Sequence, residues 1–272
     1  MRAADVPYLA GDGPVGLAHR GGPGLAANAG VENTLAAFGR AVALGYRYLE
    51  TDVHTTADGQ VVAFHDDVLD RVTDARGRIA DLPWSRVREA RVAGTEPVPL
   101  LADLLTAFPD TLVNIDVKAD AALEPTLAVL RAHDALPRVC LGSFSERRIR
   151  AARRALGPRV ATAAGPVGVA LLRFSPGPLA RLLHTPAPVL QIPAEHVVAG
   201  RRVTLVTPGL VRRAHALGKH VHVWFHAGAG EDAAEFHRLL DLGVDGLVAD
   251  RIDVLAAVLA ERGHPLAPRS AV

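Results

Sequence analysis

Eight short apolar runs alternate with segments of helical periodicity along almost the whole chain. The candidate strands are Val15–His19, Tyr46–His54, Leu112–Val117, Arg138–Leu141, Arg159–Thr162, Val189–Ile192, His220–Phe225 and Gly246–Val248. The candidate helices lie near 34–44, 100–107, 122–133, 145–155, 166–173, 207–217, 232–241 and 252–262. Strands that alternate with helices predict a parallel sheet, and eight of them predict a closed α/β barrel of the TIM type. An open doubly wound sheet is the alternative, but its usual Gly-x-Gly-x-x-Gly fingerprint is absent from this sequence.

One segment departs from this alternation. After the second run comes Val61–Phe64, followed by a polar stretch that continues to about Val98. It contains a turn signal at Asp74–Gly77 and a helix start at Leu82–Ser85. We therefore expect a small insertion, approximately 67–98, on one rim of the barrel. The 272 residues, 49% of them hydrophobic, suit one barrel domain over 1–272, because such barrels commonly run to ~250 residues.

Composition limits the partners. The 30 basic and 29 acidic residues leave a net charge of +1, so no broad basic face for nucleic acid is expected. Residues 1–16 hold no apolar signal region, and no stretch reaches the ~18 apolar residues of a membrane span. The single cysteine, Cys140, lies in an apolar run and is expected to be a buried thiol. We expect a cytoplasmic protein without stable membrane insertion, and the sequence leaves its oligomeric state open.

Two of the predicted helices carry clear end signals. Asn33 precedes the helix over 34–44 and is its expected N-cap, while Gly45 follows it. Thr207, with Pro208 at the first helical position, is the expected cap of the helix before the seventh strand. Gly218 closes that helix.

Acidic side chains occupy alternate positions near the ends of neighbouring predicted strands. Glu50 and Asp52 lie in the second run, and Asp116 ends the third. Alternate residues of a strand share a face, and barrel enzymes keep their catalytic groups at the C-terminal ends of the strands. Three hard oxygen donors there suit one divalent cation, Mg²⁺ or Ca²⁺. Salt bridges to basic residues, such as Glu50 with Arg20, are the structural alternative.

Two histidines, His19 and His65, fall at the same end of the predicted barrel. A histidine pair can supply both the base and the acid that phosphodiester cleavage needs near neutral pH. Each histidine alone is more often a structural residue, since the chain has 12 of them. His54 shares a face with Asp52, and whether it reaches the site stays open. A structural role is preferred for the remaining histidines of the seventh-strand region, His215, His220, His222 and His226.

Positive and aromatic side chains complete the predicted site. Arg20 follows the first strand and Lys118 follows the third, and both can bind phosphate oxygens. Pairing of Lys118 with Asp116 is an alternative that is compatible with this role. Trp224 ends the seventh strand, where it either walls the pocket or packs in the core. Together these residues favour hydrolysis of a phosphate ester.

The same residues form an ordered series of motifs. These are His19-Arg20-Gly21, Glu32-Asn33-Thr34, Glu50-Thr51-Asp52-Val53, Asp58-Gly59, His65-Asp66, Leu69-Asp70-Arg71-Val72-Thr73 with Gly77, Val98-Pro99-Leu100, Ser143-Phe144, Val223-Trp224 and Gly243-Val244-Asp245-Gly246. The chain resembles the glycerophosphodiester phosphodiesterase family over nearly its whole length. Two positions depart from the family pattern. Asp116 stands where Glu is common, and Phe225-His226-Ala227-Gly228 replaces a small polar run, which puts the specificity for the alcohol in question.

The resemblance implies a TIM barrel with a small insertion after the second strand. It also implies metal-dependent hydrolysis of glycerophosphodiesters to glycerol 3-phosphate and an alcohol. By position, the metal ligands are Glu50, Asp52 and Asp116, the acid/base pair is His19 and His65, and the phosphate contacts are Arg20 and Lys118. Three alternatives stay open: a phospholipase D-like enzyme or cyclising lyase acting on lysophospholipids, a non-catalytic barrel that binds a phosphorylated polyol, and, less favoured, a metal-dependent amidohydrolase.

Overall fold

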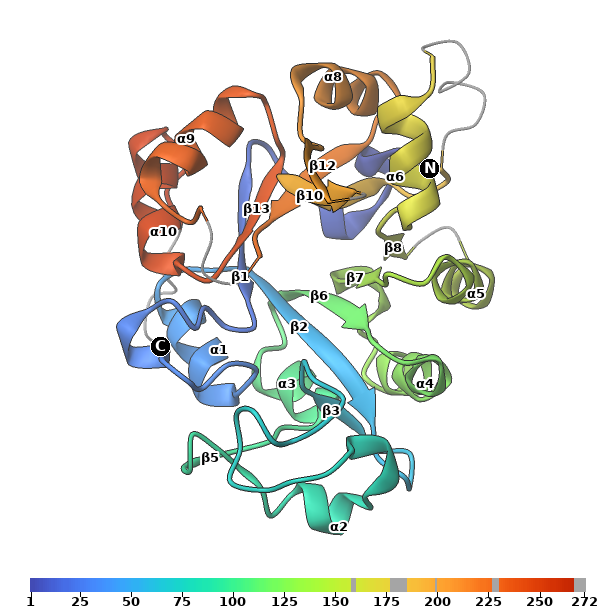
Figure 1. Ribbon diagram of the computed structural model, residues 1–272, viewed down its shortest axis with the longest axis vertical. Helices are drawn as coiled ribbons and strands as arrows, with labels where there is room; N and C mark the ends of the chain where they lie inside the picture. Colours follow the sequence, from blue (N-terminus) through green and yellow to red (C-terminus); the bar gives the residue numbers. More distant parts are fainter. Residues whose placement is uncertain (158–159, 177–184, 199, 227–229, 267–272) are drawn as a thin grey trace.

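Eight parallel strands form a nearly closed barrel with helices between them (Figure 1). The computed structural model describes residues 1–157, 160–176, 185–198, 200–226 and 230–266. The barrel strands, in sheet order, are β8 (Ala161–Thr162), β7 (Val139–Gly142), β6 (Leu112–Val117), β2 (Tyr48–Thr55), β1 (Val15–His19), β13 (Gly246–Ala249), β12 (His220–Trp224) and β9 (Val189–Pro193). A single parallel bridge from Ala163 to Val189 brings β9 beside β8. The predicted TIM barrel is therefore confirmed.

Helices surround this barrel between successive strands (Figure 1). They are α1 (Leu35–Ala43), α3 (Leu101–Ala107), α4 (Leu123–Ala132), α5 (Glu146–Leu156), α6 (Pro166–Phe174), α8 (Pro208–Ala216), α9 (Ala233–Asp241) and α10 (Ile252–Glu261). Short 3₁₀ turns lie at Ala3–Asp5, Pro7–Leu9, Ala26–Asn28, Ile79–Asp81, Asp120–Ala122 and Leu136–Arg138. The hydroxyl of Thr207 caps α8 by accepting a hydrogen bond from the Leu210 N–H, as expected.

The cap predicted for α1 is wrong by one residue. The Thr34 hydroxyl, and not the Asn33 side chain, accepts the hydrogen bond from the Ala37 N–H. Asn33 instead lies in the left-handed region, with φ 56°, and its side chain points to β2. Both residue types are good caps, so sequence alone could not separate them.

The insertion lies beside β2 and β3 (Val61–Ala63), where α2 (Trp84–Val87) and β5 (Glu96–Pro97) stand apart from the barrel in Figure 1. β3 pairs antiparallel with β2, and β5 pairs with β4 (Arg91–Val92). The segment has its own small hydrophobic core, which includes Phe64, Leu69, Ile79, Val87 and Val92. Because the insertion has this core of its own, it packs beside the barrel without contributing side chains to the barrel interior.

A second excursion was not predicted. A hairpin of β10 (Glu195–Val198) and β11 (Arg201–Thr204) stands between β9 and α8. Its described side chains are largely exposed, and Val197 is 61% exposed. Among its described side chains only Val203 packs against the core, so its sequence shows little apolar alternation and only a weak strand signal.

The barrel interior is closed at its N-terminal end by the start of the chain. Ala3, Val6, Tyr8 and Leu9 pack in one cluster with inward side chains of the strands, among them the buried Cys140. The Ala3 N–H donates to the carbonyl of Gly218, which lies just before β12. The outer core lies between strands and helices and contains most of the buried aliphatic residues.

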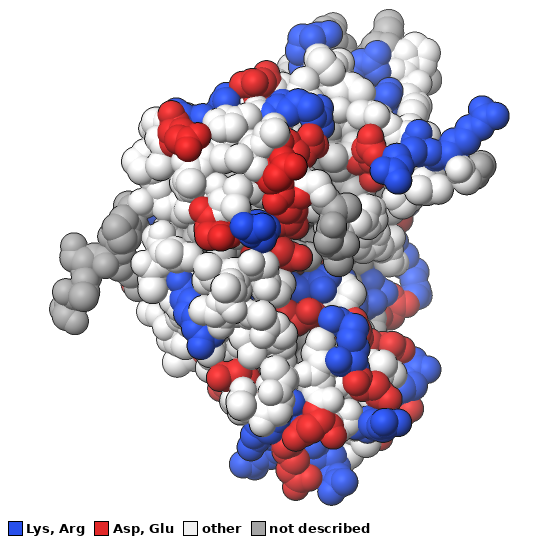
Figure 2. All heavy atoms as spheres, turned by 60° about the vertical axis from the view of Figure 1, so that its left-hand side comes forward, with Lys and Arg blue, Asp and Glu red and all other residues white. Residues whose placement is uncertain are grey.

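Charged side chains of both signs are interspersed on the face drawn in Figure 2, as the near-zero net charge of +1 would suggest. Among the described residues, no helix is both long and apolar enough to span a membrane.

Candidate active site

The predicted site residues come from adjacent strands at the C-terminal end of the barrel. His19 ends β1 and lies in register with Glu50 of β2, while Asp52 of β2 lies in register with Asp116 of β6. Lys118 directly follows β6. His65 follows β3, which pairs with β2. Since parallel strands end at one rim, residues spread over a hundred positions meet there.

His19 lies between two carboxylates, one hydrogen-bonded to its Nδ1 and one near its Nε2. Its Nδ1 lies 2.6 Å from Asp250 Oδ1, and its Nε2 lies 3.8 Å from Glu50 Oε2. Because a carboxylate only accepts, the short contact places a proton on Nδ1. Burial lowers the pKa of His19, but the negative charges of Glu50 and Asp250 outweigh this effect, and its pKa lies above the ordinary value.

The acids of β2 differ in their compensation by positive charge. Burial and the neighbouring Asp52 raise the pKa of Glu50 to about 7. Asp52 is also buried, but Lys118 and Arg20 outweigh that burial and hold its pKa below the ordinary value. Two buried carboxylates side by side are unstable without nearby cations. The charge of Asp52 is already balanced by Lys118 and Arg20. A further positive charge near Glu50 would stabilise its ionised form.

Lys118 and Arg20 supply the compensating charges. The Lys118 Nζ lies 2.7 Å from Asp52 Oδ1 and 2.8 Å from Asp116 Oδ2. Arg20 Nε lies 3.2 Å from Asp52 Oδ2 but is not aligned for a hydrogen bond. Its Nη1 donates to Glu32 Oε1 at 3.3 Å. The pairing of Lys118 with Asp116 that the sequence allowed is present, and both cations remain near the same rim.

His65 belongs to a network that is anchored in the insertion and joined to Arg20 through Glu32. Its Nδ1 lies 2.6 Å from Asp66 Oδ1, and Arg71 donates to both oxygens of Asp66 and to both oxygens of Glu32. Burial lowers the pKa of His65, and Arg20 and Lys118 add to this effect. The insertion therefore fixes the orientation of the second candidate catalytic histidine.

The backbone is strained where this site is built. Arg20 and Asn33 both have positive φ, at 49° and 56°. Left-handed non-glycine residues are uncommon and often mark functional sites. The Arg20 N–H donates to the carbonyl of Glu50 at 2.9 Å, and its carbonyl accepts from the Asn33 N–H at 2.8 Å. At Gly21, a Cβ would lie 2.8 Å from that of Ala37, so the turn requires glycine.

Aromatic rings form the outer wall of the mouth. Trp224 at the end of β12 contacts Phe144 edge to face, with centroids 5.9 Å apart. The Lys118 Nζ lies 5.9 Å from the Phe144 ring centroid. On its other side Trp224 meets the ring of His226, 4.7 Å away. Ala227 and Gly228, which belong to the predicted specificity loop, lie outside the described residues. Trp224 also packs against the apolar cluster of the barrel interior, so it contacts both the core and the rings at the mouth, and its role in substrate binding stays a prediction.

The donor set of Glu50, Asp52 and Asp116 fits a hard divalent cation in its chemistry, because three carboxylates lie on one face of adjoining strands. Across the part of the chain that the structure describes, however, no three acidic, histidine or cysteine side chains surround a common point. Lys118 bridges two of the three acids instead. The assignment of Mg²⁺ or Ca²⁺ to these residues stays a prediction.

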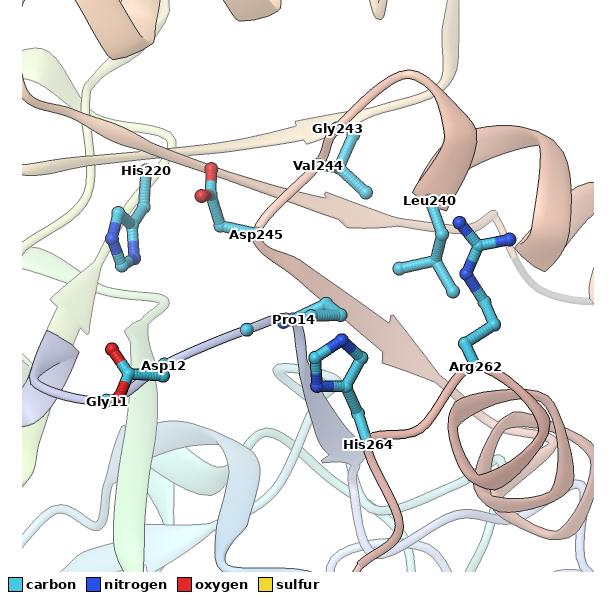
Figure 3. Close-up of a pocket in the computed structure, with 11 residues that line it drawn as sticks. Gly11, Asp12, Pro14, His220, Leu240, Gly243, Val244, Asp245, Arg262 and His264 are labelled. Atoms are coloured by element: carbon cyan, nitrogen blue, oxygen red, sulfur yellow. The ribbon is translucent and has the colours of Figure 1, made fainter.

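Two further features lie outside this arrangement. The Nε2–H of His54 donates a hydrogen bond to the carbonyl oxygen of His65, 3.1 Å away, and so supports the segment that carries His65. A cavity of about 650 Å³ lies at the opposite end of the barrel, where His220 begins β12 and Asp245 directly precedes β13 (Figure 3). Two of its charged groups are already paired, Asp245 with His215 and Arg262 with Asp241. None of the predicted site residues is among the residues that line this cavity.

Sequence reasoning missed Asp250, the partner of His19. The residue directly follows β13. It had the same signal as the other site residues, an acid at a strand end, but the predicted strand stopped at Val248. Asn33 was expected as a cap, yet its side chain donates to Asp52 at 3.3 Å and accepts from Thr51 at 2.8 Å. Such roles depend on loop conformation, which a single sequence does not reveal.

Comparison with known proteins places this chain in a family. The model of the glycerophosphoryl diester phosphodiesterase family matches residues 19–254. A Mycobacterium tuberculosis protein named probable glycerophosphodiester phosphodiesterase 2 is 40% identical over 267 residues, 96% of this chain and 97% of its own length. A rat protein named lysophospholipase D GDPD1 is 38% identical over 117 residues, 38% of this chain and 36% of its own length.

A solved structure shares the fold. The Oleispira antarctica phosphodiesterase, determined with the product sn-glycerol-3-phosphate, has a TM-score of 0.74 and 23% identity and covers 94% of this chain and 99% of its own. The family model covers most of this sequence, and the mycobacterial relative matches it nearly end to end. This chain therefore belongs to the glycerophosphoryl diester phosphodiesterase family.

Proposed function

We propose that this protein hydrolyses glycerophosphodiesters to glycerol 3-phosphate and an alcohol. The observation that carries the proposal is the grouping of His19, Arg20 and Lys118 with buried carboxylates at the C-terminal rim of a barrel of this family. The product bound to the Oleispira antarctica phosphodiesterase has the chemistry that we expect here. A binding protein without activity would not need to keep both histidines, the acids and the cations.

In this proposal the phosphate binds through the cations of the rim. Lys118 offers a point charge and Arg20 a planar fork, and both are already close together around Asp52. Negative charge grows on the phosphoryl oxygens in the transition state, so prealigned cations lower the barrier. Trp224 and Phe144 then border the part of the substrate that extends beyond the phosphate.

His19 and His65 exchange the protons of the reaction in this proposal. One removes the proton of the attacking hydroxyl, from water or from the glycerol itself, and the other protonates the departing alkoxide. A carboxylate on Nδ1 of each ring leaves each Nε2 as the atom that gives or takes the proton. If the glycerol hydroxyl attacks first, a cyclic phosphate forms, and water then opens it by the same two proton transfers in reverse.

Glu50, Asp52 and Asp116 would hold the divalent cation, which when bound supplies Lewis-acid polarisation of a phosphoryl oxygen. Support comes from the unbalanced negative charge at Glu50, where burial and Asp52 raise the pKa to about 7. Calorimetric titration with Ca²⁺ or Mg²⁺ tests the binding directly, and Glu50→Gln should weaken it. Heat of binding that is equal in both proteins would remove Glu50 from the ligand set.

The activity is tested by incubating the protein with a panel of glycerophosphodiesters and measuring release of glycerol 3-phosphate. We expect release from at least one compound with Ca²⁺ or Mg²⁺ and none in EDTA. No release from any compound would contradict the proposed function. Full activity in EDTA would contradict the role of the cation alone.

A second candidate substrate is a lysophospholipid, cleaved by the same groups. Phe144 at the mouth is 67% exposed, an unusual position for a large aromatic side chain. It contacts Trp224 and lies near Lys118, so an acyl chain could rest on it while the phosphate meets the cations. Activity on micellar lysophospholipid that exceeds activity on water-soluble diesters would favour this substrate.

A further inference from the structure

We propose that Glu231 is a positioning residue for catalysis, which fixes the turn at Asp250 and Arg251 so that Asp250 holds the imidazole of His19 in one tautomer and orientation. The proposal rests on the proposed function, because His19 matters only if it transfers a proton. Glu231 belongs to none of the motifs of the site and lies outside the barrel strands, in the segment before α9.

Glu231 binds the backbone of the turn that follows β13. Its Oε2 accepts hydrogen bonds from the N–H groups of Asp250 and Arg251, both at 2.7 Å. The side chain is half-buried and reaches this turn across about twenty residues of chain. Two short hydrogen bonds to one oxygen fix both the position and the direction of the peptide that carries Asp250.

A second contact holds the same turn from the other side. The Gly24 N–H donates to the carbonyl of Asp250 at 3.1 Å. A Cβ at Gly24 would lie 2.8 Å from the backbone carbon of Asp250, so the loop after β1 packs directly against the turn. The carboxylate of Asp250 is thereby aimed at the end of β1, where its Oδ1 lies 2.6 Å from His19 Nδ1.

The consequence of this chain of contacts is the tautomer of His19. With the proton of the neutral ring on Nδ1, its Nε2 is free to accept a proton on the side of Glu50, 3.8 Å away. If the turn relaxed, Asp250 would release Nδ1, and the ring would rotate and populate both tautomers. A carboxylate behind a catalytic imidazole serves this purpose in other hydrolases.

A purely structural role is the competing explanation. Arg251 is the N-cap residue of α10 and has no side-chain cap of its own, so Glu231 could serve only as a cap for that helix. Asp232, its neighbour, caps α9 through a hydrogen bond from the Glu235 N–H. Asp232→Ala is therefore a matched control, because it removes a helix cap one residue away and leaves the turn at Asp250 untouched.

The experiment compares Glu231→Ala, Glu231→Gln and Asp232→Ala in the full chain. Both backbone bonds end on a single oxygen of Glu231, and the amide oxygen of glutamine can replace it. We expect Glu231→Ala to lower kcat about 10-fold with KM unchanged within about twofold, as loss of an outer hydrogen-bond partner does in comparable sites. Glu231→Gln should restore kcat, and Asp232→Ala should retain it.

The tautomer is read directly from ¹⁵N chemical shifts of labelled histidine at alkaline pH, where the imidazole is neutral. The His19 signals are assigned by their loss in His19→Gln. The Nδ1–H form should dominate in the parent and in Glu231→Gln, and both forms should be populated in Glu231→Ala. An unchanged His19 spectrum in Glu231→Ala, or equal losses of kcat in Glu231→Ala and Asp232→Ala, would overturn the proposal. Absence of phosphodiesterase activity in the parent contradicts the proposed function instead, and the spectrum still reports the positioning.

Discussion

The two candidate catalytic histidines occupy opposite kinds of environment. His19 ends a central strand of the barrel and lies between two acids, Asp250 and Glu50. His65 lies on the insertion side and has one acid, Asp66, which is itself bound by Arg71. The side chain of His19 is 13% exposed and that of His65 32% exposed. The same residue type is therefore held rigidly at one side of the site and near solvent at the other.

This difference in environment shifts the pKa values of His19 and His65 in opposite directions. The acids around His19 outweigh its burial and raise its pKa, whereas burial and nearby cations lower the pKa of His65. Two titratable groups whose environments shift their pKa values in opposite directions are suited to act as acid and base in one reaction. The opposite pKa shifts thus favour different roles for His19 and His65, one as acid and one as base, over two equivalent histidines.

Replacement of either histidine should give the largest effect. We expect His19→Ala and His65→Ala each to lower kcat by ~10²-fold or more, because each removes one proton transfer. The two should differ in stability, since only His19 is deeply enclosed. Thermal unfolding should show a lower Tm for His19→Ala and little change for His65→Ala. Near-normal turnover of both variants on every diester tested would break the assignment.

Loss of the contacts by which the insertion orients His65 should lower kcat by a smaller factor. Arg71→Ala frees Asp66 and Glu32 together, so His65 loses its fixed orientation, and we expect kcat to fall about 10-fold. The matched control is Arg78→Ala in the same segment. Its ion pair with Asp67, 3.4 Å long, is more than half exposed at both ends and should contribute little. Steady-state kinetics that are equal for the two variants would show that the insertion does not orient His65.

The barrel and most of the site were predictable because they follow strand periodicity. The strands β1 and β6 begin and end where predicted, at Val15–His19 and Leu112–Val117. Polar residues at alternate positions in such strands must share a face, so Glu50, Asp52 and Asp116 could be grouped without a structure. The start predicted for the fifth strand, Arg159, lies outside the described residues, and the observed strand covers Ala161–Thr162.

The unpredicted parts depend on loops or on pairings far apart in sequence. Asp250 meets His19 across 231 positions, and Glu231 reaches the same turn from another loop. Arg71 was noted only as part of a motif, because its fork between Asp66 and Glu32 needs the folded insertion. No local periodicity encodes such contacts. Sequence therefore indicates which residues perform chemistry better than it indicates which residues orient them.

A third histidine without any partner sharpens the comparison. His222 is fully buried in β12, and both ring nitrogens lack a hydrogen-bond partner among the described residues. Burial and the nearby His220 lower its pKa to about 3. Below the ordinary value of 6.5 the unfolded chain binds a proton that the folded protein refuses. The free energy of unfolding should therefore fall as pH drops from 6.5 toward 3, by about 1.4 kcal/mol per pH unit from this group.

The measurement is urea unfolding at pH 7 and pH 5 of the parent and of His222→Leu. The variant should lose less stability over this interval, because leucine takes up no proton in either state. The test compares how much the free energy of unfolding of each protein changes between pH 7 and pH 5. Which of the two proteins is more stable at pH 7 does not affect it. Equal changes in the two proteins would mean that His222 binds a proton in the folded protein. Its pKa would then not be lowered by burial, in contrast to the expectation above.

The smallest expected effect concerns the aromatic pair at the mouth, Phe144 and Trp224. Phe144→Ala removes an exposed ring whose edge contact with Trp224 is worth about 0.5–1.5 kcal/mol in comparable pairs. If an acyl chain rests on this ring, KM for a lysophospholipid should rise about three- to tenfold, while KM for a water-soluble glycerophosphodiester changes less than about twofold. Phe174→Ala is the control, because Phe174 is similarly exposed, at 58%, but ends α6 away from the strand ends. Equal changes in KM for both substrates would assign Phe144 to the phosphate end of the site, beside Lys118, and would leave the acyl chain without an apolar subsite.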